Sequence, residues 1–355
     1  MNFKSHILFS LIAVLVIASC KKSSTPTPSP APTTGPDVYV IGSTSATNGK
    51  SVAIYWKNGT PTRLADSTSE SQARAITSQG KDVYIAGFIL GTGNDPGNYY
   101  SAAAYWKNGV ATRLDNGPYY SDAFGIGVNG NDVYVAGNIS DNFMVPHASY
   151  WKNGALNNLY NIALGSDAYS MTMNGSDVII TGDAEHMKNN SFRYIATYWK
   201  NGGVATPPTD TLSYSEAHAV AVNGSDVYAA GFSGANHTFI ATYWKNGVPT
   251  KLTDTLSTSE ASAIAVSGTD IYVAGYKVYG GHTVATYWKN GVVTKLTDGT
   301  SNCYANAIVL DGSDVYVAGS TIDANGIQVA TYWKNGAPVF LGKRSFASGI
   351  AIAQH

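Results

Sequence analysis

The chain has 355 residues, a formal net charge of −1, 13% charged residues and 37 glycines. This composition indicates a turn-rich, nearly neutral globular protein. It argues against a nucleic-acid partner, because phosphate binding needs a basic stripe and the lysines here recur once per repeat, balanced by as many carboxylates.

Residues 1–20 are predicted to be a secretory signal peptide. Lys4 lies in a short polar start, an apolar run extends from Ile7 to Ile17, and small residues precede Cys20. The run is too short for a transmembrane helix, which needs about 20 apolar residues. Residues 21–36 are rich in Ser, Thr and Pro and lack an apolar run, so we expect an extended tether.

The segment Ile17-Ala18-Ser19-Cys20 resembles the lipobox of bacterial lipoproteins, and Cys-Lys-Lys followed by the tether is similar to lipoproteins of the Bacteroidota. The resemblance implies lipidation of Cys20 and attachment to the outer membrane, the chain's expected membrane contact. An ordinary signal peptide with an incidental cysteine is the alternative, and the side of the membrane stays open. A lipidated Cys20 leaves Cys303 without an intramolecular disulfide partner.

Two motifs repeat along residues 37–355. Tyr-Trp-Lys-Asn-Gly occurs seven times, with its Trp at 56, 106, 151, 199, 244, 288 and 333. Asp-Val-Tyr-Val-Ala-Gly and its variants begin at 37, 82, 132, 177, 226, 270 and 314. Each repeat of 44 to 50 residues is predicted to hold four short strands, for example 261–266, 270–274, 283–288 and 292–296. Asn-Gly between the last two is a strong hairpin signal.

Four antiparallel strands per repeat predict an all-β fold, a seven-bladed β-propeller over residues 37–355. The domain begins at the second strand of a repeat, residues 37–41, and ends with an unpartnered first strand, residues 346–353. We therefore expect the last strand to join the first blade and close the ring. The repeated Trp residues are expected to pack blade against blade, with an aromatic ligand platform as the alternative, and each repeated Asp to accept backbone N–H bonds in its turn.

The repeats resemble WD40, kelch and NHL-type propeller repeats in length and strand number, and uncharacterised lipoproteins with Tyr-Trp-Lys-Asn-Gly repeats. These resemblances imply a fold and no activity.

One face of the propeller is predicted to carry the variable connections. If the strands of a blade are called A to D, the A-to-B and C-to-D turns are nearly uniform, whereas the B-to-C and D-to-A connections vary. Tyrosines outside the repeated motifs concentrate on the variable face, where they suit sugar or protein recognition. Capping of the core is the alternative. The candidate binding tyrosines are Tyr119, Tyr120, Tyr214 and Tyr304.

Strand A provides a second set of candidate binding residues around the axis. Its variable position, flanked by small residues, holds Arg74, Phe124, Tyr169, His218, Ser262, Asn306 and Ser348. Two positions earlier, four blades have an acid: Asp122, Asp167, Glu216 and Glu260. A solvated strand start without function is the alternative.

The sequence favours a non-catalytic binding or scaffold protein of the cell envelope that recognises a glycan, peptide or protein. No His spacing is typical of a metal site, and no phosphate loop, dinucleotide fingerprint or nucleophile elbow is present, so neither metal nor cofactor is expected. Two alternatives remain. A carbohydrate-active hydrolase or lyase would use the axial acids with His218 and Arg74, and a purely structural envelope protein would use neither set of candidate residues.

Overall fold

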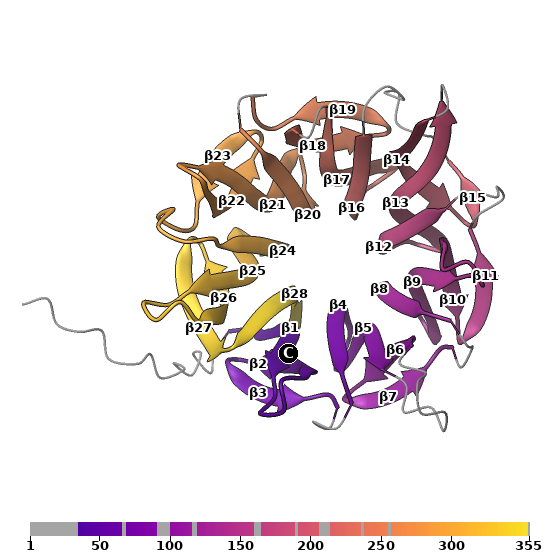
Figure 1. Ribbon diagram of the computed structural model, residues 1–355, viewed down its shortest axis with the longest axis horizontal. Helices are drawn as coiled ribbons and strands as arrows, with labels where there is room; N and C mark the ends of the chain where they lie inside the picture. Colours follow the sequence, from indigo (N-terminus) through magenta and orange to yellow (C-terminus); the bar gives the residue numbers. More distant parts are fainter. Residues whose placement is uncertain are drawn as a thin grey trace, which may run out of the picture.

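The computed structural model describes residues 35–65, 69–90, 100–115, 119–159, 165–188, 191–205, 214–235, 238–254 and 257–353. They form seven four-stranded antiparallel sheets arranged as blades around one axis (Figure 1), which confirms the predicted propeller. The predicted signal peptide with Cys20, and residues 21–34 of the tether, lie outside the described residues. No helix in the described part of the chain is long and apolar enough to cross a membrane.

Each blade contains its strands in the order A, B, C, D from the axis to the rim. Blade 1 consists of β28 (Ser345–Ala353), β1 (Asp37–Ser45), β2 (Ser51–Lys57) and β3 (Thr60–Arg63). Blade 2 consists of β4 (Ser71–Gln79), β5 (Asp82–Leu90), β6 (Ser101–Lys107) and β7 (Val110–Arg113). Blade 3 consists of β8 (Ser121–Asn129), β9 (Asp132–Ser140), β10 (Pro146–Lys152) and β11 (Ala155–Asn158). Blades 4 and 5 are β12 (Ser166–Asn174), β13 (Asp177–Lys188), β14 (Ser191–Lys200) and β15 (Gly203–Val204); and β16 (Tyr214–Asn223), β17 (Asp226–Ala235), β18 (Thr238–Lys245) and β19 (Val248–Lys251). Blades 6 and 7 are β20 (Ser259–Ser267), β21 (Asp270–Tyr279), β22 (His282–Lys289) and β23 (Val292–Lys295); and β24 (Tyr304–Asp311), β25 (Asp314–Ile322), β26 (Gln328–Lys334) and β27 (Ala337–Lys343).

The ring closes as predicted, through a blade built from both ends of the domain. Strand β28 pairs antiparallel with β1, with Val40 opposite Ile350, and Figure 1 shows β28 among the innermost strands. Ile350 also packs in one buried cluster with Trp56 of the same blade and Tyr316 of blade 7. Closure brings the first and last blades into contact and gives β1 a partner strand on its axial side.

The repeated tryptophans fill the spaces between blades, as predicted. Trp106 of blade 2 is fully buried and packs against Tyr39 and Ile41 of blade 1. Trp151 of blade 3 packs in the same way against Tyr84 of blade 2. All seven indoles are at most 3% exposed, which leaves no open aromatic platform for a ligand.

The repeated Asp, Asn and Lys form one polar unit per blade. In blade 2, Asn108 Nδ2 donates to Asp82 Oδ1 at 2.8 Å, and Lys107 lies 2.9 Å from Asp82 Oδ2. The backbone N–H of Val83 donates to Asn108 Oδ1 at 2.9 Å. The expectation that the Asp accepts backbone N–H bonds is therefore wrong in its detail. The Asn side chain takes that bond, because it lies between the turn and the carboxylate.

The uniform turns share one face, which we call the turn face, and the opposite face is the loop face. Each C-to-D turn is an Asn-Gly pair with both φ angles positive, for example Asn58 at 50° and Gly59 at 82°, as a type I′ turn requires. On the loop face, the B-to-C connection of blade 6 is shorter than the variable loop that the sequence analysis expects. The strands β21 and β22 continue to a Tyr279–His282 pair around Gly280 and Gly281, whose φ angles are both positive.

Candidate functional site

Every A strand contains a one-residue bulge at the position that varies between repeats. In β4, Ala73 pairs with Gly87 and Ala75 with Ala86, so Arg74 has no partner in the ladder. The opposite glycine is required, because a Cβ at Gly87 would overlap the carbonyl oxygen of Gln72. The seven bulge residues are Arg74, Phe124, Tyr169, His218, Ser262, Asn306 and Ser348.

The bulge residues of blades 2 to 5 contact one another around the axis. The Arg74 guanidinium lies 4.4 Å from the centre of the Phe124 ring. Phe124 and Tyr169 meet edge to face with centroids 6.0 Å apart, as do Tyr169 and His218 at 5.4 Å. We call the bulge residues, together with the residues two positions before them, the axial mouth. Four blades thus present one continuous arc of rings and cations.

In blades 7 and 1 the bulge residues instead tie neighbouring A strands together. Asn306 Nδ2 donates to the carbonyl oxygen of Ala347 at 2.8 Å, and the Ser348 hydroxyl donates to the carbonyl oxygen of Ala73 at 2.6 Å. These bonds give Asn306 and Ser348 a structural role in closing the ring. The chemically varied part of the axial mouth is therefore the arc over blades 2 to 6.

The axial acids of blades 3, 5 and 6 are next to cations of the chain itself. Asp122 lies 3.6 Å from Arg74. Glu216 Oε2 and Glu260 Oε1 lie 3.0 and 3.2 Å from the two ring nitrogens of His218. Burial alone would lower the pKa of His218, but the hydrogen bonds with both glutamates outweigh it and raise this pKa to about 9. His218 is therefore a cation at neutral pH.

The acids of blade 4 have no comparable cation. Asp167 and Asp183 are paired across β12 and β13. The Asn138 amide donates to Asp167. Asp183 is fully buried, and although the Tyr169 hydroxyl is close enough to lower its pKa somewhat, neither carboxylate oxygen has a hydrogen bond of ordinary geometry.

Burial and mutual repulsion raise the pKa of both carboxyl groups. Burial, followed by repulsion from Glu216, raises the pKa of Asp167 to about 6. Burial, followed by repulsion from Asp167 and Glu216, raises the pKa of Asp183 to about 8. At neutral pH, Asp183 is therefore mostly a neutral carboxylic acid in the middle of an acidic cluster.

The sequence analysis missed the row of residues to which Asp183 belongs. The position after the glycine of strand B is paired in register with the residue two positions before the bulge, which is an acid in blades 3 to 6. It holds Ser43, Phe88, Asn138, Asp183, Phe232, Tyr276 and Ser320. Tyr276 donates to Glu260 at 2.9 Å, and Phe232 lies 5.6 Å from His218. The signal was available, because this position varies directly after the constant glycine of strand B.

Six of the non-motif tyrosines meet in pairs, within the connections of the loop face or in strands. Tyr120 meets Tyr100 at 4.7 Å, Tyr214 meets Tyr194 at 6.4 Å, and Tyr304 meets Tyr276 at 5.5 Å between ring centroids. Tyr120 and Tyr214 are each 43% exposed, whereas Tyr119 and Tyr304 are half-buried. The candidate tyrosines thus differ in exposure, and their role in recognition stays a prediction.

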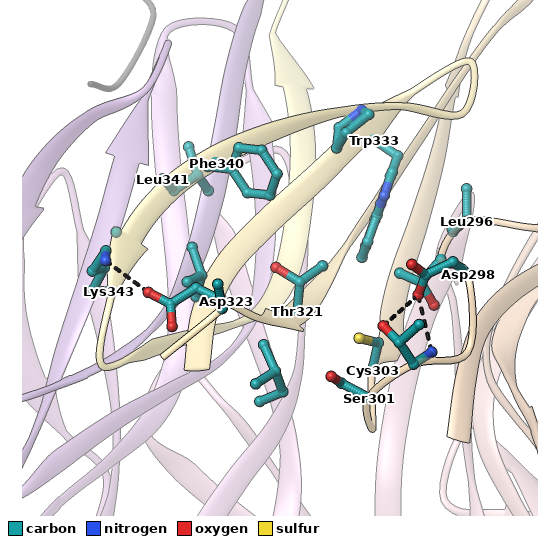
Figure 2. A pocket seen from close by; sticks show the side chains of 17 residues that line it. Leu296, Asp298, Ser301, Cys303, Thr321, Asp323, Trp333, Phe340, Leu341 and Lys343 are labelled. Atoms are coloured by element: carbon teal, nitrogen blue, oxygen red, sulfur yellow. Dashed lines mark hydrogen bonds and ion pairs between the residues drawn. The ribbon is translucent and has the colours of Figure 1, made fainter. Parts of the chain in front are cut away.

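A hollow that the sequence did not indicate lies between blades 6 and 7. Its volume is about 670 Å³, and it is lined by the β23–β24 connection, the end of β25, and parts of β26 and β27. Figure 2 shows Cys303 near Asp298 at one end and the Lys343–Asp323 ion pair, 2.7 Å long, at the other. The Cys303 thiol is buried, which raises its pKa.

Cys303 stands where the other six blades have a serine. In five of these blades the serine hydroxyl accepts the backbone N–H of an alanine in strand C, as Ser121 does from Ala103 at 2.9 Å. In blade 6 the hydroxyl of Thr297 accepts the N–H of Ala285 at 3.2 Å instead. Among the described residues, no group of three or more His, Cys, Asp or Glu side chains is arranged to hold a metal ion.

The comparisons with known proteins support the fold alone. No protein-family model and no curated protein matches the chain. A puromycin-hydrolysing peptidase of Mycobacterium tuberculosis is similar with a TM-score of 0.57 at 12% identity, over 87% of this chain and 52% of that one. The propeller domain of the Trilobed protease of Pyrococcus furiosus gives 0.55 at 9% identity, over 87% and 95%. The acylaminoacyl peptidase of Pyrococcus horikoshii gives 0.51 at 11% identity, over 86% and 50%.

This chain therefore spans about half of each of the two whole peptidases and nearly all of the separate propeller domain. At these identities the similarity is one of architecture, since propellers with unlike functions share it. The function of this chain has to be argued from its own side chains.

Proposed function

We propose that this chain is a cell-envelope binding protein, anchored through lipid on Cys20, that recognises a glycan, peptide or protein with its loop face. One observation carries the proposal. The turn face repeats one Asp-Lys-Asn unit in every blade, whereas the axial mouth and the tyrosine pairs of the loop face differ from blade to blade. Varied polar and aromatic groups on a rigid ring provide a surface for specific recognition.

The lipid anchor is supported by the sequence Ile17-Ala18-Ser19-Cys20 and by the Ser/Thr/Pro-rich segment behind it. Two acyl chains hold a protein stably at a membrane, where one does not. Metabolic labelling with a fatty-acid analogue tests this part: label should be incorporated by the natural chain and lost in Cys20→Ser.

Glycan and peptide arrays test the recognition surface. Tyr120→Ala combined with Tyr214→Ala removes two exposed rings from the loop face. The matched control, Val110→Ser with Val248→Ser, changes two exposed side chains at the start of D strands, next to the turn face. The proposal expects at least tenfold weaker array binding for the tyrosine pair alone. Equal binding by all three proteins, or none by the natural chain, argues for a structural role.

A carbohydrate-active enzyme is the second candidate, and one observation favours it. Burial raises the pKa of Asp183, whereas the nearby cation His218 lowers the pKa of Glu260 despite its burial. Carboxyl groups whose pKa values are pushed apart can serve as acid and base. This candidate predicts release of reducing or unsaturated sugar from a polysaccharide panel, and loss of that release in Asp183→Asn and in Glu260→Gln.

A further inference from the structure

Around the axial mouth, the acids of blades 3, 5 and 6 form ion pairs with cations, whereas the acids of blade 4 form none with the described residues. Arg74 lies beside Asp122, and His218 lies between Glu216 and Glu260. The ion pairs formed among the described residues include neither Asp167 nor Asp183. Two neighbouring carboxyl groups are thus left between two neutralised regions of the same arc.

Titratable side chains from several neighbouring strands surround Asp167 and Asp183. On β12 and β13, Tyr169 and Glu185 face it; on β16, Glu216 and His218; on β10, His147; and on β14, Tyr194. His147 is held 3.2 Å from Asp141, and His218 is shared by two glutamates. Glu216 and Glu185 both repel the charge of Asp167, so this cluster of carboxyl groups favours an added positive charge.

The neighbouring rings suit an organic cation. Phe124 and Tyr169 meet edge to face, and the Tyr169 hydroxyl lies near Asp183. The chain already uses this environment for a cation of its own, because Arg74 lies over both Phe124 and Phe88, at 4.4 and 5.3 Å. Aromatic faces combined with carboxylates are the chemistry that binds ammonium groups.

We propose that the axial mouth at blade 4 binds a protonated primary amine, whose ammonium group pairs with Asp167 and, once it has lost its proton, with the neighbouring carboxyl group of Asp183. This inference rests on the proposed function and names the chemical group that the loop face recognises. The amine can belong to a lysine side chain or to an amino sugar, since both present the same ammonium group.

Binding of the amine releases a proton. The ammonium ion enters with its charge, Asp183 loses its carboxyl proton to the buffer, and the complex keeps the ammonium and the new carboxylate as a pair. Because the pKa of Asp183 is about 8, the binding-competent carboxylate form becomes about fivefold rarer from pH 8 to pH 7 and about tenfold rarer from pH 7 to pH 6. Affinity should therefore rise from pH 6 to pH 8.

Calorimetry on the full chain tests the inference with four probes. They are an end-blocked peptide with one lysine, the same peptide with acetyl-lysine, glucosamine and N-acetylglucosamine. We expect one amine source to bind at least tenfold more tightly than its acetylated form, and the affinity of the lysine peptide to fall about fivefold from pH 8 to pH 7. Repeating the titration in buffers of different ionisation enthalpy should show about one proton released.

The variant Asp183→Asn keeps the shape of the side chain, and blade 3 already has Asn138 at the equivalent position. It should abolish both the proton release and the slope of affinity with pH. Val248→Ser, next to the turn face, should change neither.

Two results would overturn the inference: acetylated and free amines binding equally, or binding with no proton release. They leave the proposed function standing if the Tyr120 and Tyr214 variant still loses array binding. If that variant binds every array ligand as the natural chain does, the proposed function itself is wrong.

Discussion

Asp183 and Asn138 occupy the same place in adjacent blades, yet their hydrogen bonding differs. Asn138 donates to Asp167 and accepts the backbone N–H of Ala168 at 2.7 Å, so it satisfies both partners. Asp183 meets Tyr169 and the repelling carboxylates instead, and neither of its oxygens has an ordinary hydrogen bond. A single change from amide to acid thus converts a structural link between blades into a group that costs stability when ionised.

Asp183→Asn should stabilise the protein at high pH. The folded-state pKa of about 8 lies above the unfolded value, so the stability linked to the proton is complete below about pH 4 and is lost as the pH rises towards 8. From pH 5 to pH 9, the unfolding free energy of the variant should gain at least about 1.4 kcal/mol on that of the natural chain, the equivalent of one pKa unit. Denaturation in urea measures this difference. A constant difference across the pH range would mean that Asp183 ionises normally.

Because position 303 has a cysteine where the other blades have a serine, we expect the stability effects of changing Thr297 and Cys303 to be coupled. Thr297→Val should cost about 1 kcal/mol, because it leaves the buried N–H of Ala285 without its acceptor. Cys303→Ser should change stability little on its own, but it should rescue most of the loss in the double variant, since five other blades use a serine there. A double-mutant cycle from urea denaturation measures the coupling. Additive effects would show that a serine at 303 does not reach Ala285.

The sequence predicted part of this chemistry. Comparison of the repeats identified the bulge residues and the axial acids, because those positions vary while their neighbours stay small. It could not pair His218 with both Glu216 and Glu260, because that contact joins two blades 44 residues apart in the sequence. The hollow around Cys303 was also beyond prediction, since it depends on how β27 and the β23–β24 connection pack.

At the scale of the strand, the bulge in strand A requires the glycine opposite it in strand B. The bulge in β24 shifts the register between Ala305 and Ala307, and it brings the carbonyl oxygen of Tyr304 against Gly319 of β25. Only glycine fits, because any Cβ would overlap that oxygen. The constant Gly of the Asp-Val-Tyr-Val-Ala-Gly motif therefore exists to turn the bulge residue out of the ladder.

Gly319→Ala should be strongly destabilising, by about 2 kcal/mol or more, because the backbone of β24 has to move. Gly203→Ala in β15 is the matched control, since the nearest atom to a Cβ there is 3.7 Å away, and it should stay within about 0.5 kcal/mol. Thermal unfolding measures both. Equal stability of the two variants would show that the bulge adapts to a side chain.

Strand positions were predicted more closely than strand ends. The D strand expected at 292–296 is Val292–Lys295, whereas the B strand expected at 270–274 extends to Tyr279. Alternation of side chains defines where a strand lies, but its end depends on the partner strand. Here His282 continues the pairing around Gly280 and Gly281.

At the scale of the whole molecule, the ring depends on β28. Removing residues 345–355 takes away the A strand of blade 1 and its buried Ile350, and it exposes the edge of β1. The truncated chain should lose cooperative thermal unfolding, and a synthetic peptide of residues 345–353 should restore it. An unchanged transition after truncation would show that six complete blades hold the seventh without its innermost strand.

The central claim is that the two faces of the ring differ in function, and site-specific photo-crosslinking in native envelopes tests it most directly. A photoreactive residue would replace Tyr120 on the loop face, 43% exposed, or Val110 next to the turn face, 72% exposed. We predict a discrete adduct from position 120 and none from position 110, despite the greater exposure of the latter. Adducts of equal yield from both positions, or from position 110 alone, would contradict recognition through the loop face.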